Sequence, residues 1–370
     1  TFSRLARLPR ASFFLLGVRG VGKSTWAARV LPGAHRIDLL DERRYHDYLA
    51  DPGLFAGELA ALVPGSWVIV DEVQRIPGLL NEVHRFIESR RLKFALLGSS
   101  ARKLKAAGTN LLAGRAQRKL MHPLTAAELD ADFDLGLALR HGTIPLVWTA
   151  EDRDAALEAY VQLYLREEIR AEALVRNLPG FVRFLPIAAL FHGQAISVSG
   201  IARDAGVARM TVDGYLEILE DTLLVYRLPG YEAKLRARER KHPKLYWIDP
   251  GLVRAVKRQL GPVTAEETGP LSEGFVLHLL RAHAEEKNCS TTSPIGRRLK
   301  QCARKWTFCC AASANSLPSR SRPASASSVP CCRDCARSRR CLAWCGVSSS
   351  TPASAPCAWT RASKSGLSGA

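Results

Sequence analysis

A glycine-rich segment that ends in a lysine and two hydroxyl residues carries the clearest chemistry in this sequence. It reads GVRGVGKST over residues 17–25, after the apolar run FFLL and before a helix-forming run. Glycines let the backbone curl so that successive amide N–H groups face one centre, and the start of a helix adds the positive end of its dipole. Such a loop binds phosphate groups. The residues expected to contact them are Gly17, Gly20, Val21, Gly22, Lys23, Ser24 and Thr25.

A second apolar run, residues 67–70, ends in the adjacent acids Asp71 and Glu72. We expect Asp71 and the hydroxyl group of Ser24 to hold Mg²⁺, because both supply oxygen ligands. Glu72 is expected to orient and deprotonate the attacking water. Lys23 should reach the β and γ phosphates as a mobile positive charge. The pattern therefore predicts a nucleoside triphosphate bound with Mg²⁺, and it makes Lys23 and Glu72 catalytic candidates.

A third apolar run, KFALLGSS, ends in two serines, Ser99 and Ser100. In the additional-strand division of P-loop ATPases, the strand between the phosphate-loop strand and the acidic strand ends in a polar residue that senses the γ-phosphate. Ser99 is our candidate for that place, and Ser100 is the alternative. No N-K-x-D stretch for guanine recognition occurs in the sequence, so ATP is favoured over GTP.

A positive charge that stabilises the transferring phosphoryl group would complete such a site. Arg115 is the candidate, and it lies in the segment LAGRAQRKLMHPLTAAEL that follows the third run. Arg102 and Arg118 are the alternatives. If Arg115 acts on the nucleotide of a neighbouring copy, the protein must form a homo-oligomer.

The elements that position these residues are apolar strands separated by helical patterns. They predict an α/β domain over residues 1–145, with a parallel sheet flanked by helices and ATP at the carboxyl ends of its strands. Residues 146–232 are expected to form a helical and winged-helix region, with helices at 198–205 and 209–219. The segment TLLVYRLPGY that follows could supply wing strands. Residues 233–288 are expected to begin a truncated α/β domain.

The second helix of the predicted helix-turn-helix is poorly equipped to read DNA bases. Base readout relies mainly on Arg, Asn and Gln, whereas this helix offers few such side chains and several acids. The basic segment KLRARERKHPK, residues 234–244, could contact phosphates or form a solvated loop. A role as an interdomain module or as a contact for an unknown protein partner is therefore favoured over specific DNA binding. The helix residues concerned are Arg209, Thr211, Asp213, Glu217, Glu220 and Asp221.

Several motifs together resemble a known family. GVRGVGKST, VIVDEVQRIPGLL, FALLGSSARKL, LAGRAQRKLMHPLTAAEL, HPKLYWIDPGLVRAV and SEGFVLHLL occur in family order between residues 12 and 287. They resemble the bacterial and archaeal AAA-superfamily P-loop ATPases whose C-terminal part is the domain of unknown function DUF4143. One departure is Gly-Val-Arg at residues 17–19, where many members have Gly-Pro-Arg. The resemblance implies an ATPase core, a helical and winged-helix segment, and a C-terminal part similar to the restriction-endonuclease-like fold.

All ten cysteines lie in residues 289–370, which also hold 13 basic residues and one acid. The family usually shows Y-W, E-V-D-F and I-E-V-K motifs in its C-terminal part, and none is present here. Residues 294–296, 304–309 and 318–323 can be encoded by synonymous codons that, read one base out of register, give these three motifs in order. We therefore hypothesise a reading-frame slip after about residue 288, rather than a disulfide scaffold or a zinc module. Such a tail should bury no core and remain disordered.

Composition limits the remaining classes of function. Residues 1–288 carry a net charge of only +6 out of the total of +18, so the excess of basic residues belongs mainly to the tail. No apolar run approaches the roughly 18 residues that span a bilayer, so no membrane partner and a cytoplasmic location are expected. The leading hypothesis is a Mg²⁺-dependent ATPase that couples hydrolysis to conformational change in its C-terminal parts. The alternatives are a nucleotide-gated DNA-binding or regulatory module and a non-functional relic.

Overall fold

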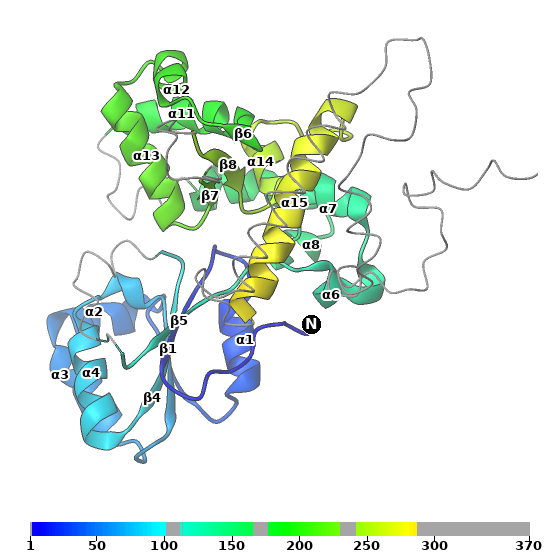
Figure 1. Cartoon of the computed structure of the whole chain (residues 1–370). Coiled ribbons are helices and arrows are strands. Elements are labelled where there is room, and N and C mark those ends of the chain that lie inside the picture. Colours follow the sequence, from blue (N-terminus) through cyan, green and yellow to red (C-terminus); the bar gives the residue numbers. More distant parts are fainter. Residues whose placement is uncertain (1, 101–111, 113, 166–176, 230–241, 287–370) are drawn as a thin grey trace, which may run out of the picture. The chain divides into compact units, whose positions relative to one another are not determined.

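The first part of the chain is built on a five-stranded sheet in the order β2-β3-β4-β1-β5. The computed structural model describes residues 2–100, 112, 114–165, 177–229 and 242–286 (Figure 1). Every neighbouring pair in this sheet is parallel, which confirms the predicted α/β fold. Because β4 lies between β1 and β3, it is the additional strand that the sequence predicted. The strands are β1 (Phe13–Leu16), β2 (His35–Asp38), β3 (Trp67–Asp71), β4 (Lys93–Gly98) and β5 (Gln117–Leu120).

Both faces of this sheet are covered. Alternate residues of β1, β3 and β4 enter two separate hydrophobic clusters, which explains why these strands are almost continuously apolar in sequence. Helix α1 (Lys23–Val30) contributes to one cluster through Trp26 and Ala27. The opposite face is covered by α2 (Glu42–Ala50), α3 (Pro52–Ala60) and α4 (Leu79–Arg90), as Figure 1 shows.

A series of short helices follows the sheet. Helix α6 begins with a capping box, in which the side chains of Thr125 and Glu128 each accept a bond from the other residue's backbone N–H. The last helix of the series is a π-helical segment, η4, and π-helices are rare in proteins. The elements are α6 (Ala126–Leu129), η3 (Asp130–Asp132), α7 (Leu135–His141), α8 (Pro145–Trp148), α9 (Arg153–Ala159) and η4 (Tyr160–Leu165).

Three helices and a small antiparallel sheet form the next group. The predicted helix at 198–205 is confirmed as α12 (Val198–Ala205), and the predicted second helix runs two residues further, as α13 (Arg209–Asp221). Helix α11 and these two helices share buried residues such as Phe181, Ile201 and Tyr215. The sheet has the order β6-β8-β7. The other elements are α11 (Leu178–Leu190), β6 (Gln194–Ala195), β7 (Val225–Leu228) and β8 (Lys244–Trp247).

The described chain ends in α14 (Pro250–Val256) and α15 (Ala265–Glu286). Strand β8, from the segment that the sequence assigned to a third domain, pairs with β6 and β7. Among the described residues, no helix has both the length and the apolar character needed to cross a bilayer. The hypothesis of a frame slip concerns residues 289–370, which lie outside the described residues, as do Arg102 and most of the basic segment 234–244.

Asp249 joins α14 to the loop after α7. Its carboxylate is completely buried and accepts hydrogen bonds from the backbone N–H of Leu252 at 3.0 Å and of Thr143 at 2.6 Å. A Cβ atom on Gly142, whose φ is +75°, would overlap this carboxylate. Burial raises the pKa of Asp249 to about 6, although the bonds from Thr143 and Leu252 act in the opposite direction. The side chain therefore serves both as a helix cap and as a link between two distant segments.

Replacement of Asp249 by alanine should destabilise the fold more than loss of a simple helix cap. Asp249→Ala leaves buried N–H groups of two segments without an acceptor, which costs about 2–4 kcal/mol. The matched control is Asp152→Ala, because the exposed Asp152 caps only α9 through the N–H of Ala155. That change should cost about 1 kcal/mol. Urea unfolding of the full chain measures both, and equal losses would contradict the linking role of Asp249.

Candidate nucleotide site

The phosphate loop runs from the end of β1 to the start of α1. Its amide at Gly17 donates to the carbonyl oxygen of Gly98 at the end of β4, over 3.2 Å. A Cβ atom at Gly17 would lie 2.5 Å from the carbonyl oxygen of Met121, so no larger residue fits there. Gly22 has a φ of 88° and is the N-cap of α1, which favours glycine because the backbone is left-handed. The sequence motif is thus explained by backbone geometry at both ends of the loop.

Lys23 lies against the inside of this loop. The side chain is buried, and its Nζ donates to the carbonyl oxygens of Gly17 at 2.9 Å and of Val18 at 3.3 Å. Val21 is fully buried in the core, so only its main chain is available to a ligand in this conformation. Thr25 is exposed on the first turn of α1. The Lys23 ammonium group therefore lies against the backbone of the loop.

Ser24 and Asp71 are brought together although 47 positions separate them in the sequence. The Ser24 hydroxyl lies near the Asp71 carboxylate at the end of β3. Burial raises the pKa of Asp71, and the nearby Glu72 carboxylate adds to that rise, while Ser24 and Lys23 oppose it. A hydroxyl oxygen and a carboxylate oxygen near one another are hard ligands that suit Mg²⁺. The pair predicted to hold the metal therefore has chemistry and placement that fit it.

Glu72 belongs to a small polar cluster at the ends of β3 and β4. Its backbone is left-handed, with φ of 55°, and its amide donates to Asp71 Oδ1 at 3.0 Å. The Oε2 atom of Glu72 accepts from Ser99 Oγ at 3.3 Å and from the side-chain amide of Gln74. The same amide nitrogen of Gln74 donates to Ser99 Oγ at 2.9 Å. Glu72 and Ser99 were both predicted for the site, and the structure places them in contact.

Gln74 is the residue of this cluster that the sequence analysis missed. It is buried and lies in the 3-10 helix η1 (Val73–Arg75), directly after the acidic pair. The available signal was a glutamine two positions after Glu72 in the motif VIVDEVQRIP. That signal was weak, because only the tight turn of η1 directs the side chain back toward Glu72.

Arg115 does not join this site within its own chain. It precedes β5, whose first residue, Gln117, pairs with Phe13 at the amino end of β1. The nucleotide site lies beyond the carboxyl end of β1, so Arg115 is at the opposite edge of the sheet. Its guanidinium is paired with Glu88 of α4. Arg118 lies within β5, and the alternative serine, Ser100, is buried after β4.

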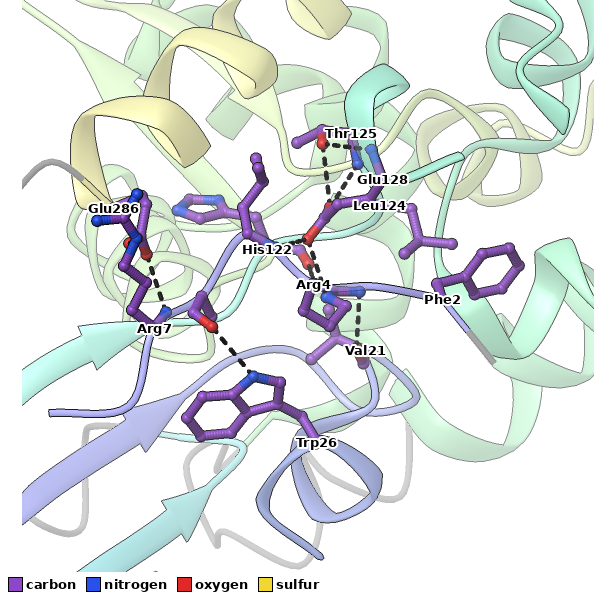
Figure 2. Close-up of polar contacts among 12 residues, drawn as sticks. Phe2, Arg4, Arg7, Val21, Trp26, His122, Leu124, Thr125, Glu128 and Glu286 are labelled. Atoms are coloured by element: carbon purple, nitrogen blue, oxygen red, sulfur yellow. Dashed lines mark hydrogen bonds and ion pairs between the residues drawn. The ribbon is translucent and has the colours of Figure 1, made fainter. Parts of the chain in front are cut away.

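The N-terminal segment crosses the outer side of the loop and α1, which no sequence motif indicated. Arg4 Nη1 donates to the carbonyl oxygen of Val21 at 3.4 Å, and Arg4 Nε lies 3.1 Å from Glu128 Oε1 (Figure 2). The indole Nε1 of Trp26 donates to the carbonyl oxygen of Ala6 at 3.2 Å, as Figure 2 also shows. The side chain of Arg4 is only 8% exposed. The segment before β1 therefore takes part in holding the phosphate loop.

Comparisons with known proteins divide the chain in a similar way. Residues 9–130 match the family model of an AAA domain, and residues 133–262 match a domain of unknown function, DUF8612. The second match is to a different family model from the DUF4143 that the motifs suggested. Uncharacterized proteins of Mycobacterium bovis and Mycobacterium tuberculosis are each 30% identical over 290 residues, or 76% of this chain. The match spans 65% of the length of each of these relatives.

More distant similarities are weaker. An uncharacterized protein of Haemophilus influenzae is 23% identical over 233 residues, which is 58% of each chain. A Walker-type ATPase of Pyrococcus abyssi is 17% identical with a TM-score of 0.44, covering 66% of this chain and 90% of its own. That score is too low to support an argument. Residues 9–130 therefore have the parallel sheet and the glycine-rich loop expected of the AAA domain whose family model they match.

Proposed function

We propose that this protein is a Mg²⁺-dependent ATPase that uses hydrolysis to change the conformation of the parts that follow its AAA domain. The observation that carries the proposal is that Ser24 and the buried ammonium group of Lys23 both lie near the Asp71 carboxylate, at the inside of the phosphate loop. The ammonium and hydroxyl of two adjacent residues and a carboxylate from a distant point in the sequence come together next to a loop of backbone amides. This combination serves phosphoryl transfer.

Each residue of the candidate nucleotide site has a distinct task in this proposal. The amides of the loop and Lys23 bind the β and γ phosphates. Ser24 and Asp71 would hold Mg²⁺, which supplies positive charge to the phosphate oxygens when it is bound. Glu72 accepts a proton from the attacking water, whose oxygen bonds to the γ-phosphorus while the bond to the β–γ bridging oxygen breaks.

Two neighbours keep the Glu72 carboxylate in place for this task. Ser99 and Gln74 both donate to its Oε2 atom and are themselves hydrogen bonded to each other. The bonds restrict the carboxylate to one orientation at the end of β3. Ser99 also lies at the end of β4, the place proposed for a side chain that senses the γ-phosphate.

We further propose that residues 178–247 form a winged-helix module that contacts a protein partner. Support comes from the succession of α11, α12 and α13 and from the antiparallel sheet β6-β8-β7 beside them. On α13, Met210 is 86% exposed, whereas Glu220 is paired with Arg227 inside the module. An exposed methionine is suited to an apolar contact and not to a DNA backbone.

Arg115 is proposed to act on the nucleotide of a neighbouring copy, which would make the active form a homo-oligomer. Its place at the amino ends of the strands supports this proposal, because the nucleotide site of the same chain lies at their carboxyl ends. Its ion pair with Glu88 is half exposed, so the guanidinium is accessible to another chain.

The tail is proposed to be the product of a reading-frame slip after about residue 288, in a C-terminal part that would otherwise carry the DUF4143 motifs. The ordered emergence of the three motifs from one shifted register supports this. Resequencing the gene is expected to reveal one inserted or deleted base relative to close relatives. A gene that reads in frame as printed here would contradict the proposal.

Lys23→Ala should abolish tight nucleotide binding. Loss of a charge-assisted contact to phosphate weakens binding by about 10- to 150-fold, and turnover should fall below detection. Calorimetric titration with MgADP and a phosphate-release assay measure the two effects. Lys93→Ala is the matched control, because Lys93 lies at the amino end of β4, away from the site. Binding that survives Lys23→Ala unchanged would exclude the proposed role of the loop.

Glu72→Gln should separate binding from chemistry. Glutamine keeps an oxygen for Ser99 but cannot take up the proton of water, so turnover should fall by about 10²- to 10⁴-fold. The affinity for MgATP should change by less than a factor of about three, since the side chain does not hold the phosphates. Glu82→Gln on the outer helix α4 is the control. Wild-type turnover in Glu72→Gln would remove Glu72 from the mechanism.

A further inference from the structure

The carbonyl groups of the phosphate loop fall into two sets according to where their hydrogen-bond donors come from. The carbonyls of Gly17 and Val18 accept from Lys23 Nζ, and the carbonyl of Gly22 accepts from the amide of Trp26 within α1. These three bonds come from the loop's own helix. They belong to the AAA motif itself.

The three carbonyls between them are bonded from outside that motif. The carbonyl of Arg19 accepts from the hydroxyl of Tyr160 at 2.9 Å, and the carbonyl of Gly20 accepts from the amide of Leu146 at 3.3 Å. The carbonyl of Val21 accepts from the guanidinium of Arg4 at 3.4 Å, as Figure 2 shows. All three donors therefore lie outside the AAA match at residues 9–130, with Arg4 before it and the other two after it.

These bonds matter for the amides because each peptide unit is planar. The N–H of a trans peptide points away from the C=O of the same unit, so a donor that fixes one carbonyl also fixes the following amide. The bond from Tyr160 to Arg19 thus sets the direction of the Gly20 N–H. The bond from Arg4 to Val21 sets the direction of the Gly22 N–H. A carbonyl that accepts a hydrogen bond also strengthens its own unit as a donor on the other side.

Tyr160 occupies an unusual place in the fold. It is 2% exposed and is the first residue of the π-helical segment η4, directly after α9. π-helical turns are energetically poor and often mark functional positions. Nearby, α8 approaches Gly20 so closely that a Cβ atom there would lie 2.9 Å from Leu146 Cβ. Leu146 and Tyr160 therefore both lie directly against the phosphate loop.

We infer that Tyr160 is a positioning residue for nucleotide phosphates, which it orders by fixing the Arg19–Gly20 peptide. Since Tyr160 belongs to the region that matches DUF8612, that region sets the affinity of the loop for nucleotide. By reciprocity, bound nucleotide stabilises the conformation in which η4 contacts the loop. The inference rests on the proposed function. It names the contact through which nucleotide turnover would first change the conformation of the parts after the AAA domain.

Tyr160→Phe tests this inference, with Tyr215→Phe as the matched control. Tyr215 is also buried, and its hydroxyl donates to the carbonyl of Asn177 at the same 2.9 Å, on a helix outside the AAA domain. Both changes delete one hydroxyl that donates to one carbonyl. Without nucleotide, both should lower the melting temperature by a similar amount. The Kd for MgADP, from calorimetric titration of the full chain, should rise about three- to tenfold in Tyr160→Phe only.

The outcomes separate the inference from the proposed function. Wild-type protein that fails to bind MgADP would refute the proposed function and this inference with it. Wild-type binding together with an unchanged Kd in Tyr160→Phe would overturn the inference alone. An equal rise in both variants would show a general loss of stability and would also overturn it. Leu146→Ala, which removes the Cδ2 atom packed near Gly20 but keeps Cβ, the backbone amide and Tyr160, should raise the Kd in the same direction by a smaller factor.

Discussion

Parallel pairing of β1, β4 and β3 is the constraint on which the nucleotide site depends. Because the three strands run in one direction, their carboxyl ends meet at one edge of the sheet. The phosphate loop leaves β1, Asp71 ends β3 and Ser99 follows β4 at that edge. Ser24 and Asp71 lie near one another only because this pairing brings residues of distant sequence position together. The composition of the candidate nucleotide site is therefore a consequence of strand direction and order.

Burial on both faces fixes the register of the paired strands. The two hydrophobic clusters take alternate side chains of the same strands, so a shift of one residue in register would exchange the two sets. Such a shift would also move the Asp71 carboxylate away from Ser24. The same apolar side chains that stabilise the sheet thus fix the position of the polar groups at its edge.

Residues outside the AAA match also hydrogen bond to the phosphate loop. Arg4, Leu146 and Tyr160 supply three hydrogen bonds to consecutive carbonyls, two of them from the region after the AAA match. Asp249 holds that region together, since its buried carboxylate links α14 to the loop at Thr143. Contacts between the phosphate loop and residues 146 and 160 therefore continue, through Thr143 and Asp249, to α14, which packs on α11 and β8.

The sequence by itself determined the features that depend only on residues close together in the chain. The loop from Gly17 to Thr25, the acids at Asp71 and Glu72, and the helices at 198–205 and 209–219 follow from local pattern and backbone preference. Only the tertiary structure decided which side chains meet. Gln74 reaches Glu72 because η1 turns tightly, Arg115 is on the far edge because β5 runs parallel to β1, and Tyr160 reaches Arg19 across 141 positions. Periodicity records how each segment is buried, whereas contacts between segments depend on how the whole chain packs.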